Sequence, residues 1–146
     1  MVERERLCIV LLSGSFERVH YALCMASAAA ALEQPVTLFV TLGALRALVA
    51  ADATGRPGWM SLPGAEDAAA PPGVDGAALD ARNRERGVAG FEELLHACTA
   101  LGVELMVCEM GLRTLGLTPD ALRSEVKLEP GGLATVLGRG GRIVVL

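Results

Sequence analysis

The chain has 146 residues, a length typical of a single domain, and 52% of them are hydrophobic while 21% are charged. This composition excludes an intrinsically disordered chain. The net charge is −4 and the sequence has no cluster of lysine and arginine, which argues against a nucleic-acid partner. Aromatic residues make up only 3%, so the core has to be built from alanine, leucine and valine.

The N-terminal part of the chain contains one short apolar run, LCIVLL, at residues 7–12. A secretory signal peptide has a longer apolar region followed by a cleavage site, and a membrane-spanning helix needs about 20 apolar residues. Neither pattern is present, and acidic residues are mixed with the flanking arginines. We therefore expect a cytoplasmic protein, and peripheral association with a membrane surface stays open.

Residues 7–14 form a nearly all-apolar run closed by Ser-Gly, which is typical of a central strand in a parallel sheet. Residues 15–34 are rich in good helix formers and stop at Pro35. This helix is apolar on almost every side past Tyr21, so we expect something besides its own sheet to cover it. A neighbouring subunit is the natural candidate, which predicts a homo-oligomer, with a trimer or a larger assembly among the options.

The next two segments repeat the alternation of strand and helix. Residues 35–43 are β-branched and apolar, as in a strand, and residues 44–52 predict a short helix. The order of strand, helix, strand and helix is the signature of a right-handed βαβ crossover.

The segment at about 53–88 has a different character, with most of the prolines, many glycines and mixed charges. It shows no sustained period, so we expect a long Gly/Pro-rich insertion that is either functional or mobile. It holds the only tryptophan, Trp59. We expect this side chain to pin the loop to the body of the domain, and a lid over a site is the alternative.

The C-terminal half continues the alternation. The expected elements are a helix at 90–102, a strand at 103–108, a turn or short helix at 111–117, a helix at 118–125, a short strand and Gly-rich turn at 126–132, a short helix at 133–141 and a last strand at 142–146. The whole chain, 1–146, is therefore predicted to be a single α/β domain. Its sheet has about five mainly parallel strands with helices on both faces, as in flavodoxin-like folds.

The sequence has four cysteines with no Cys-x-x-Cys spacing, which leaves a zinc ribbon or a thioredoxin motif unsupported. In a cytosolic chain the default is four free thiols. Cys8 lies inside a strand and Cys98 on the apolar face of a helix, so both are expected to be buried. Cys24, in the all-round apolar helix, is expected in the core or at a subunit contact.

Cys108 differs because it ends a strand, at the carboxyl edge where open α/β folds place ligand sites. The backbone N–H groups of a following helix would stabilise a thiolate and lower the pKa of the thiol. Arg113 would add positive charge, while Glu109 would work against it. A low-pKa thiolate suits thiol transfer, persulfide chemistry or reaction with peroxide. Simple packing of a strand-end cysteine is the alternative.

Other polar candidates are few. Ser13, Gly14 and Ser15 follow the first strand and could hold an anion, but capping of the first helix is the better interpretation. Gly131 and Gly132 could bring backbone amides near a ligand or simply form a turn. The two histidines have no companions at metal-ligand spacing, so neither a metal nor a cofactor is predicted.

Three segments, 13–48, 90–122 and 126–146, resemble the DsrE/DsrF-like family, which includes sulfur-relay subunits of the TusD type. The branch of peroxiredoxin-like DsrE proteins is the most similar. The matching features are the VTLFVT run, the strand that ends in the cysteine loop, and the Gly-Gly turn before the last strand. The resemblance implies a small homo-oligomeric α/β domain. It also implies that Cys108 matches the family cysteine, which carries a persulfide in sulfur-relay members.

The leading functional hypothesis is a sulfur carrier or sulfurtransferase-like protein that holds sulfane sulfur on Cys108 and relays it between a donor and an acceptor protein. The alternative is a non-catalytic homo-oligomer that binds a small ligand or acts as a scaffold. A peroxide-reducing thiol enzyme is the weakest option, because no resolving cysteine is evident. A carrier needs an exposed and acidic Cys108. The candidate pocket residues are Ser13, Gly14, Ser15, Gly43, Met110, Gly111, Arg113, Gly131 and Gly132, and Arg46 is a further candidate for nearby positive charge.

Overall fold

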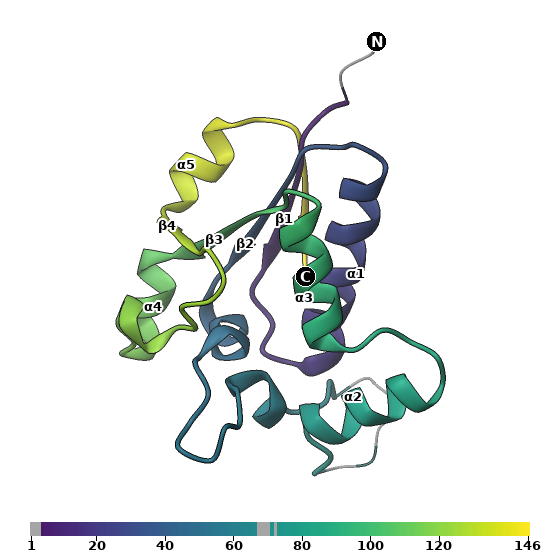
Figure 1. The fold of residues 1–146 in the computed structure, drawn as a ribbon. Coiled ribbons are helices and arrows are strands. Elements are labelled where there is room, and N and C mark those ends of the chain that lie inside the picture. The colour runs from purple at the N-terminus through teal and green to yellow at the C-terminus, as the bar shows by residue number, and fades with distance from the viewer. Residues whose placement is uncertain (1–3, 67–70, 72) are drawn as a thin grey trace.

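A computed structural model describes residues 4–66, 71 and 73–146. Its centre is a five-stranded sheet in which every neighbouring pair is parallel, in the order β4-β3-β2-β1-β5 (Figure 1). The strands are β1 (Leu7–Leu11), β2 (Val36–Val40), β3 (Glu104–Cys108), β4 (Glu129–Gly131) and β5 (Arg142–Val145). The expected α/β fold, with about five mainly parallel strands and helices on both faces of the sheet, is confirmed.

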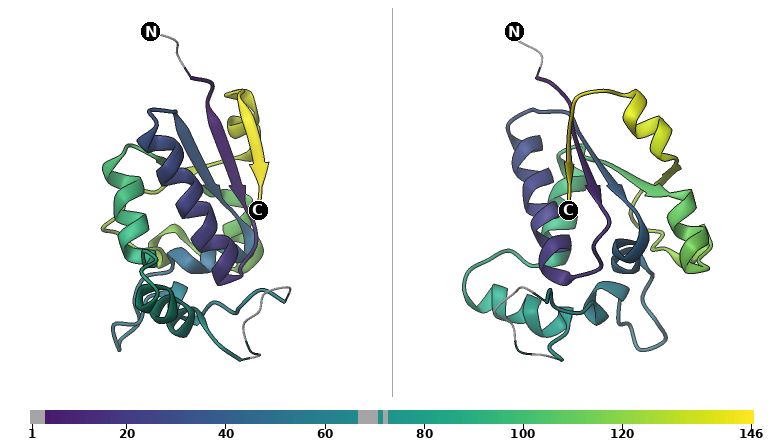
Figure 2. Two further views of the ribbon diagram at one scale, coloured as in Figure 1. Left: turned by 90° about the vertical axis from the view of Figure 1, so that its right-hand side faces the viewer. Right: turned by 180° about the vertical axis from the view of Figure 1, so that it is seen from behind.

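The two faces of the sheet are covered unequally. One face packs against α1 (Phe16–Ala31) and α3 (Phe91–Ala100), and we call it the α1 face (Figures 1 and 2). Among the described residues, the helices on the opposite side are two short ones, α4 (Glu109–Leu115) and α5 (Leu133–Gly138). We call this side the α5 face. Because side chains alternate along a strand, Ile9 points to the α1 face and Val10 to the α5 face.

The helix α1 is apolar on most sides because it contacts both the sheet and α3. Its buried stripe packs on the sheet, and α3 lies alongside it. The helix α3 therefore provides a second cover within the chain, and the neighbouring subunit stays a prediction. The outward side of the helix carries Arg18 and Tyr21, both exposed.

The α5 face holds a small separate cluster of buried residues, which we call the α5 cluster: Cys8, Val10, Phe39, Met106, Cys108 and Val136. Only Val136 of α5 is buried, while Leu133 and Leu137 of the same helix are exposed. Ile143 and Val145 on the edge strand β5 are also exposed. They pair in register with Cys8 and Val10, so they extend the apolar surface of this face.

The middle segment is more ordered than its composition suggests. It contains a 3-10 turn, η2 (Gly58–Ser61), and a helix, α2 (Gly76–Glu85), that the sequence did not predict. Trp59 is 3% exposed and stacks on Phe91 of α3, with ring centroids 4.8 Å apart. Its indole N–H donates to Glu92 Oε1 at 2.9 Å. Trp59 is therefore an anchor for this segment, as expected, and not part of a lid.

Two predicted helices are shorter and tighter than expected. The segment 44–52 is a 3-10 helix, η1 (Leu42–Leu48), and 118–125 contains only the turn η3 (Pro119–Ala121). Both are held by the isolated antiparallel bridge between Val49 and Leu122, which imposes extended backbone where the helices were expected. Among the described residues, no helix is both long and apolar enough to cross a bilayer.

Candidate functional site

Cys108 is the last residue of β3 and the N-cap of α4. Its Sγ accepts a hydrogen bond from the backbone N–H of Gly111 at 3.4 Å. The position at the carboxyl edge of a parallel sheet is the one predicted. The exposure that a carrier needs is absent in this conformation, because Cys108 is only 2% exposed and belongs to the α5 cluster.

The side chains expected around Cys108 are exposed on α4, whereas Cys108 is buried. Glu109, Met110 and Arg113 all lie on the exposed side of α4. Gly111 is the buried member of this turn, and its small size is required. A Cβ atom added there would lie 2.6 Å from Thr41 Oγ1 and 2.8 Å from the backbone N of Leu42. The first turn of α4 therefore packs directly on the end of β2.

Thr41 is a residue of this site that the sequence did not single out. It follows β2 just as Cys108 ends β3, and the register Val40 with Val107 makes Thr41 and Cys108 the next pair along the two strands. Phe39, two residues before Thr41, is in the α5 cluster together with Cys108. Thr41 could have been found from its position directly after β2, because a polar residue at that strand end lies at the same sheet edge as Cys108.

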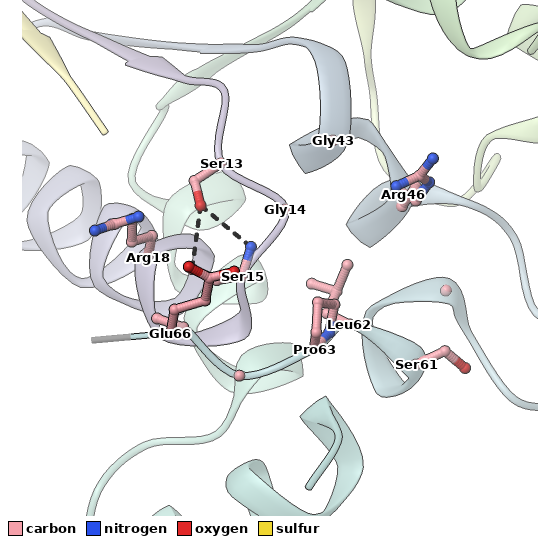
Figure 3. Close-up of a pocket in the computed structure, with 13 residues that line it drawn as sticks. Ser13, Gly14, Ser15, Arg18, Gly43, Arg46, Ser61, Leu62, Pro63 and Glu66 are labelled. Atoms are coloured by element: carbon pink, nitrogen blue, oxygen red, sulfur yellow. Dashed lines mark hydrogen bonds between the residues drawn. The ribbon is translucent and has the colours of Figure 1, made fainter. Parts of the chain in front are cut away.

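A second group of predicted residues lines an open cavity with a volume of about 820 Å³ (Figure 3). Ser13, Gly14 and Ser15, which follow β1, and Gly43, which follows β2, all border it. The two glycines touch back to back, since a Cβ on Gly14 would lie 3.0 Å from the carbonyl oxygen of Gly43.

The polar lining of this cavity comes from serines and from charges of both signs. Ser13 Oγ shares a hydrogen bond with Ser15 Oγ at 3.1 Å and accepts one from the backbone N–H of Ser15 at 3.2 Å. Arg18, Arg46 and Glu66 supply the charges. Ser15 is the N-cap residue of α1, but its side chain makes no capping hydrogen bond, so the expected capping role is wrong in this detail.

The remaining predicted residues do not join this cavity. Met110, Gly111 and Arg113 belong to α4, and Cys108 is not among the lining residues. Gly131 ends β4 and lies against Met106, where an added Cβ would be 2.6 Å from the sulfur. Gly132 is the N-cap residue of α5. The structure thus has two separate places, a cavity beside α1 and a buried thiol beneath α5.

The other three cysteines differ from Cys108 in their surroundings. Burial raises the pKa of the Cys8 thiol, and burial followed by the nearby Cys24 raises the pKa of Cys98 to about 11. Cys24 is half-buried, and burial raises its pKa as well. It lies on α1, which covers the face of the sheet opposite to Cys108, so the structure does not bring it to Cys108 as a resolving thiol.

His20 lies between Cys24 and the backbone carbonyl of Ala89. His20 Nε2 lies 2.8 Å from the carbonyl oxygen of Ala89, which can only accept, so Nε2 carries the proton. Nδ1 lies 3.7 Å from Cys24 Sγ. Within the described part of the chain, no three or more His, Cys, Asp or Glu side chains form a group that could hold a metal ion.

Comparison with known proteins gives one informative result. No family model matches the chain. The chain is similar to the sulfur carrier protein DsrE2 of Allochromatium vinosum, with 30% identity over 123 aligned residues, and the match covers 75% of this chain and 77% of the relative. This level of identity over most of both proteins agrees with the resemblance seen in the sequence and with the parallel α/β fold. The chain therefore belongs to the DsrE/DsrF-like family.

Proposed function

We propose that this protein is a sulfur carrier that holds one sulfane sulfur atom on Cys108 as a persulfide and passes it to a partner thiol. The observation that carries the proposal is the place of Cys108, at the carboxyl edge of the sheet, where Gly111 donates a backbone hydrogen bond to its sulfur. A donor N–H stabilises the thiolate that the chemistry requires. Membership of a family that includes a named sulfur carrier supports the same function.

The loading step is an exchange between sulfur atoms and needs no external oxidant. The Cys108 thiolate attacks the outer sulfur of a donor persulfide, a new S–S bond forms at Cys108, and the donor's S–S bond breaks. The electron pair of the broken bond leaves on the donor as a thiolate. Delivery is the same exchange in reverse, with the acceptor thiolate attacking the outer sulfur on Cys108.

Both steps require that the cover over Cys108 moves aside. The α5 cluster is closed on its outer side by a six-residue helix that contributes one buried side chain, Val136. A helix that is held by so little buried apolar surface opens at low cost. We propose that docking of a donor or acceptor protein displaces α5 and exposes the thiol.

Replacing Val136 by alanine is expected to raise the rate at which iodoacetamide alkylates Cys108 by about threefold to tenfold, because the mutation removes apolar contacts that close the cluster. The rate is measured by mass spectrometry of the peptide that carries Cys108. Val19→Ala is the matched control, since it removes the same two methyl groups from the buried stripe of α1 on the opposite face. An equal increase in both variants would show general loosening and would contradict the role of α5.

The loading itself is tested by intact mass spectrometry after incubation of the reduced protein with polysulfide. We expect the wild type to gain about 32 Da, the mass of one sulfur atom, and to lose it again on reduction. Cys108→Ser should gain nothing at that site. Cys24 is the one cysteine of the four that is not fully buried, so the comparison is made in a Cys24→Ser background. An adduct that persists in the Cys108→Ser variant would reject the proposal.

We also propose a homo-oligomer in the cytoplasm, in which a second copy covers the exposed apolar residues of the edge strand β5 and leaves α5 free to move. A parallel sheet is normally covered on both faces, whereas Ile143 and Val145 are exposed here. The free thiols suit a reducing compartment. Sedimentation of the wild type and of Ile143→Glu tests the assembly, and a wild type that sediments as a monomer would reject it.

A second candidate function is binding of a small ligand without chemistry. The cavity of about 820 Å³ favours it, because Cys108 is not part of its lining. If this is the function, the Cys108→Ser variant binds the ligand as tightly as the wild type.

A further inference from the structure

We infer that the hydroxyl of Thr41 holds the outer sulfur atom of the Cys108 persulfide by donating a hydrogen bond to it. The inference rests on the proposed function and adds a sulfur-binding residue to it. It starts from two features that the loading chemistry alone does not explain, a buried hydroxyl without a partner and the tight packing of α4 on the end of β2.

Thr41 is 7% exposed, and its Oγ1 is one of two buried side-chain oxygen or nitrogen atoms in the described residues that lack a hydrogen-bond partner. A buried hydroxyl without a partner is unfavourable, and such groups in native proteins are few. Thr41 is the N-cap residue of η1, yet its side chain makes no capping hydrogen bond. The hydroxyl has no protein partner among the described residues and can donate to an acceptor placed beside it.

The position of this hydroxyl relates it to Cys108 through Gly111. The Gly111 N–H donates to Cys108 Sγ. A Cβ atom added to Gly111 would lie 2.6 Å from Thr41 Oγ1, so Gly111 also contacts Thr41. The strand register also places Thr41 next to Cys108 at the ends of β2 and β3. Thr41 Oγ1 does not hydrogen-bond to Cys108 Sγ itself, since it has no partner.

A persulfide changes this geometry because its outer sulfur lies about 2.05 Å beyond Sγ. That atom carries the negative charge when the persulfide is ionised, and an anion accepts stronger hydrogen bonds than a neutral group. The Thr41 hydroxyl, which has no partner when Cys108 is a thiol, thus gains a hydrogen-bond acceptor when sulfur is loaded.

The test compares Thr41→Val, which keeps the shape and removes the hydroxyl, with Thr41→Ser, which keeps the hydroxyl. Each reduced variant is loaded with polysulfide in the Cys24→Ser background, excess reagent is removed, and the loaded fraction is followed over time by intact mass spectrometry. We expect Thr41→Val to lose the added sulfur about tenfold faster than the parent protein, and Thr41→Ser to lose it within about twofold of the parent rate.

A second readout separates this role from a structural one. Because the hydroxyl has no partner in the thiol form, Thr41→Val should unfold at the same urea concentration as the parent or at a higher one. If Thr41→Val does not fold, Thr41→Ala is compared with Thr41→Ser in the same way. Equal persulfide lifetimes with and without the hydroxyl, in a parent protein that loads, would overturn the inference. A parent protein that does not load at Cys108 would instead reject the proposed function.

Discussion

Replacing Trp59 by alanine is expected to lower the free energy of unfolding by about 3–5 kcal/mol. The indole is 3% exposed, stacks on Phe91 and contacts Phe16, so its removal leaves a large cavity between the middle segment and the helices of the α1 face. It also removes the N–H that donates to Glu92. Urea unfolding followed by far-UV circular dichroism measures the change without depending on tryptophan fluorescence.

Tyr21→Ala is the control for this prediction, because Tyr21 is 62% exposed and its replacement should change the free energy of unfolding by less than about 0.5 kcal/mol. Trp59→Phe should fall between the two, since it keeps an aromatic ring against Phe91 and loses the indole N–H. A loss below about 1 kcal/mol for Trp59→Ala would show that the middle segment is not anchored to the domain.

Replacing Asp80 by alanine is expected to cost about 2–3 kcal/mol. Asp80 is a buried carboxylate, 3% exposed, on the α2 helix. Its Oδ1 accepts the backbone N–H of Phe91 at 2.7 Å, at the start of α3, and its Oδ2 accepts from Arg84 Nε at 3.1 Å. Without the carboxylate, the buried N–H of Phe91 has no acceptor at this place.

Asp80→Asn separates the two contacts, because its amide oxygen can still accept from Phe91 while the pair with Arg84 is lost. It should cost less than Asp80→Ala, since the Arg84 side chain is largely exposed and such pairs contribute little. Glu85→Ala, at an exposed position of the same helix, should be close to neutral. If Asp80→Ala is as neutral as Glu85→Ala, the junction between α2 and α3 does not stabilise the fold.

The strands could be predicted from the sequence because each is a short apolar run bounded by turn residues. The helix α2 could not, since GAALDARNRE has a single large buried apolar residue, Leu79, and no stripe at helical spacing. This helix is held by tertiary contacts, such as that of Asp80 with Phe91, which no local pattern reveals.

For the candidate site, the sequence predicted where Cys108 stands but not how it is covered. Its position at a strand end follows from the local apolar pattern. Its burial depends on Val136 of α5, which lies much later in the sequence. Ser13, Gly14, Ser15 and Gly43 converge on one cavity because they follow neighbouring strands, whereas Arg113 turns outward with the exposed side of α4. Thr41 could have been noted from its position after β2, but only the structure shows that its hydroxyl has no partner among the described residues.

The central claim is that Cys108 holds a sulfur atom that a nucleophile can remove, and cyanolysis tests it most directly. Cyanide attacks the outer sulfur of a persulfide, releasing thiocyanate and regenerating the cysteine thiolate. After loading in the Cys24→Ser background and removal of excess polysulfide, we expect close to one equivalent of thiocyanate per chain, and almost none when Cys108→Ser is added. Equal yields from the two proteins would contradict the account.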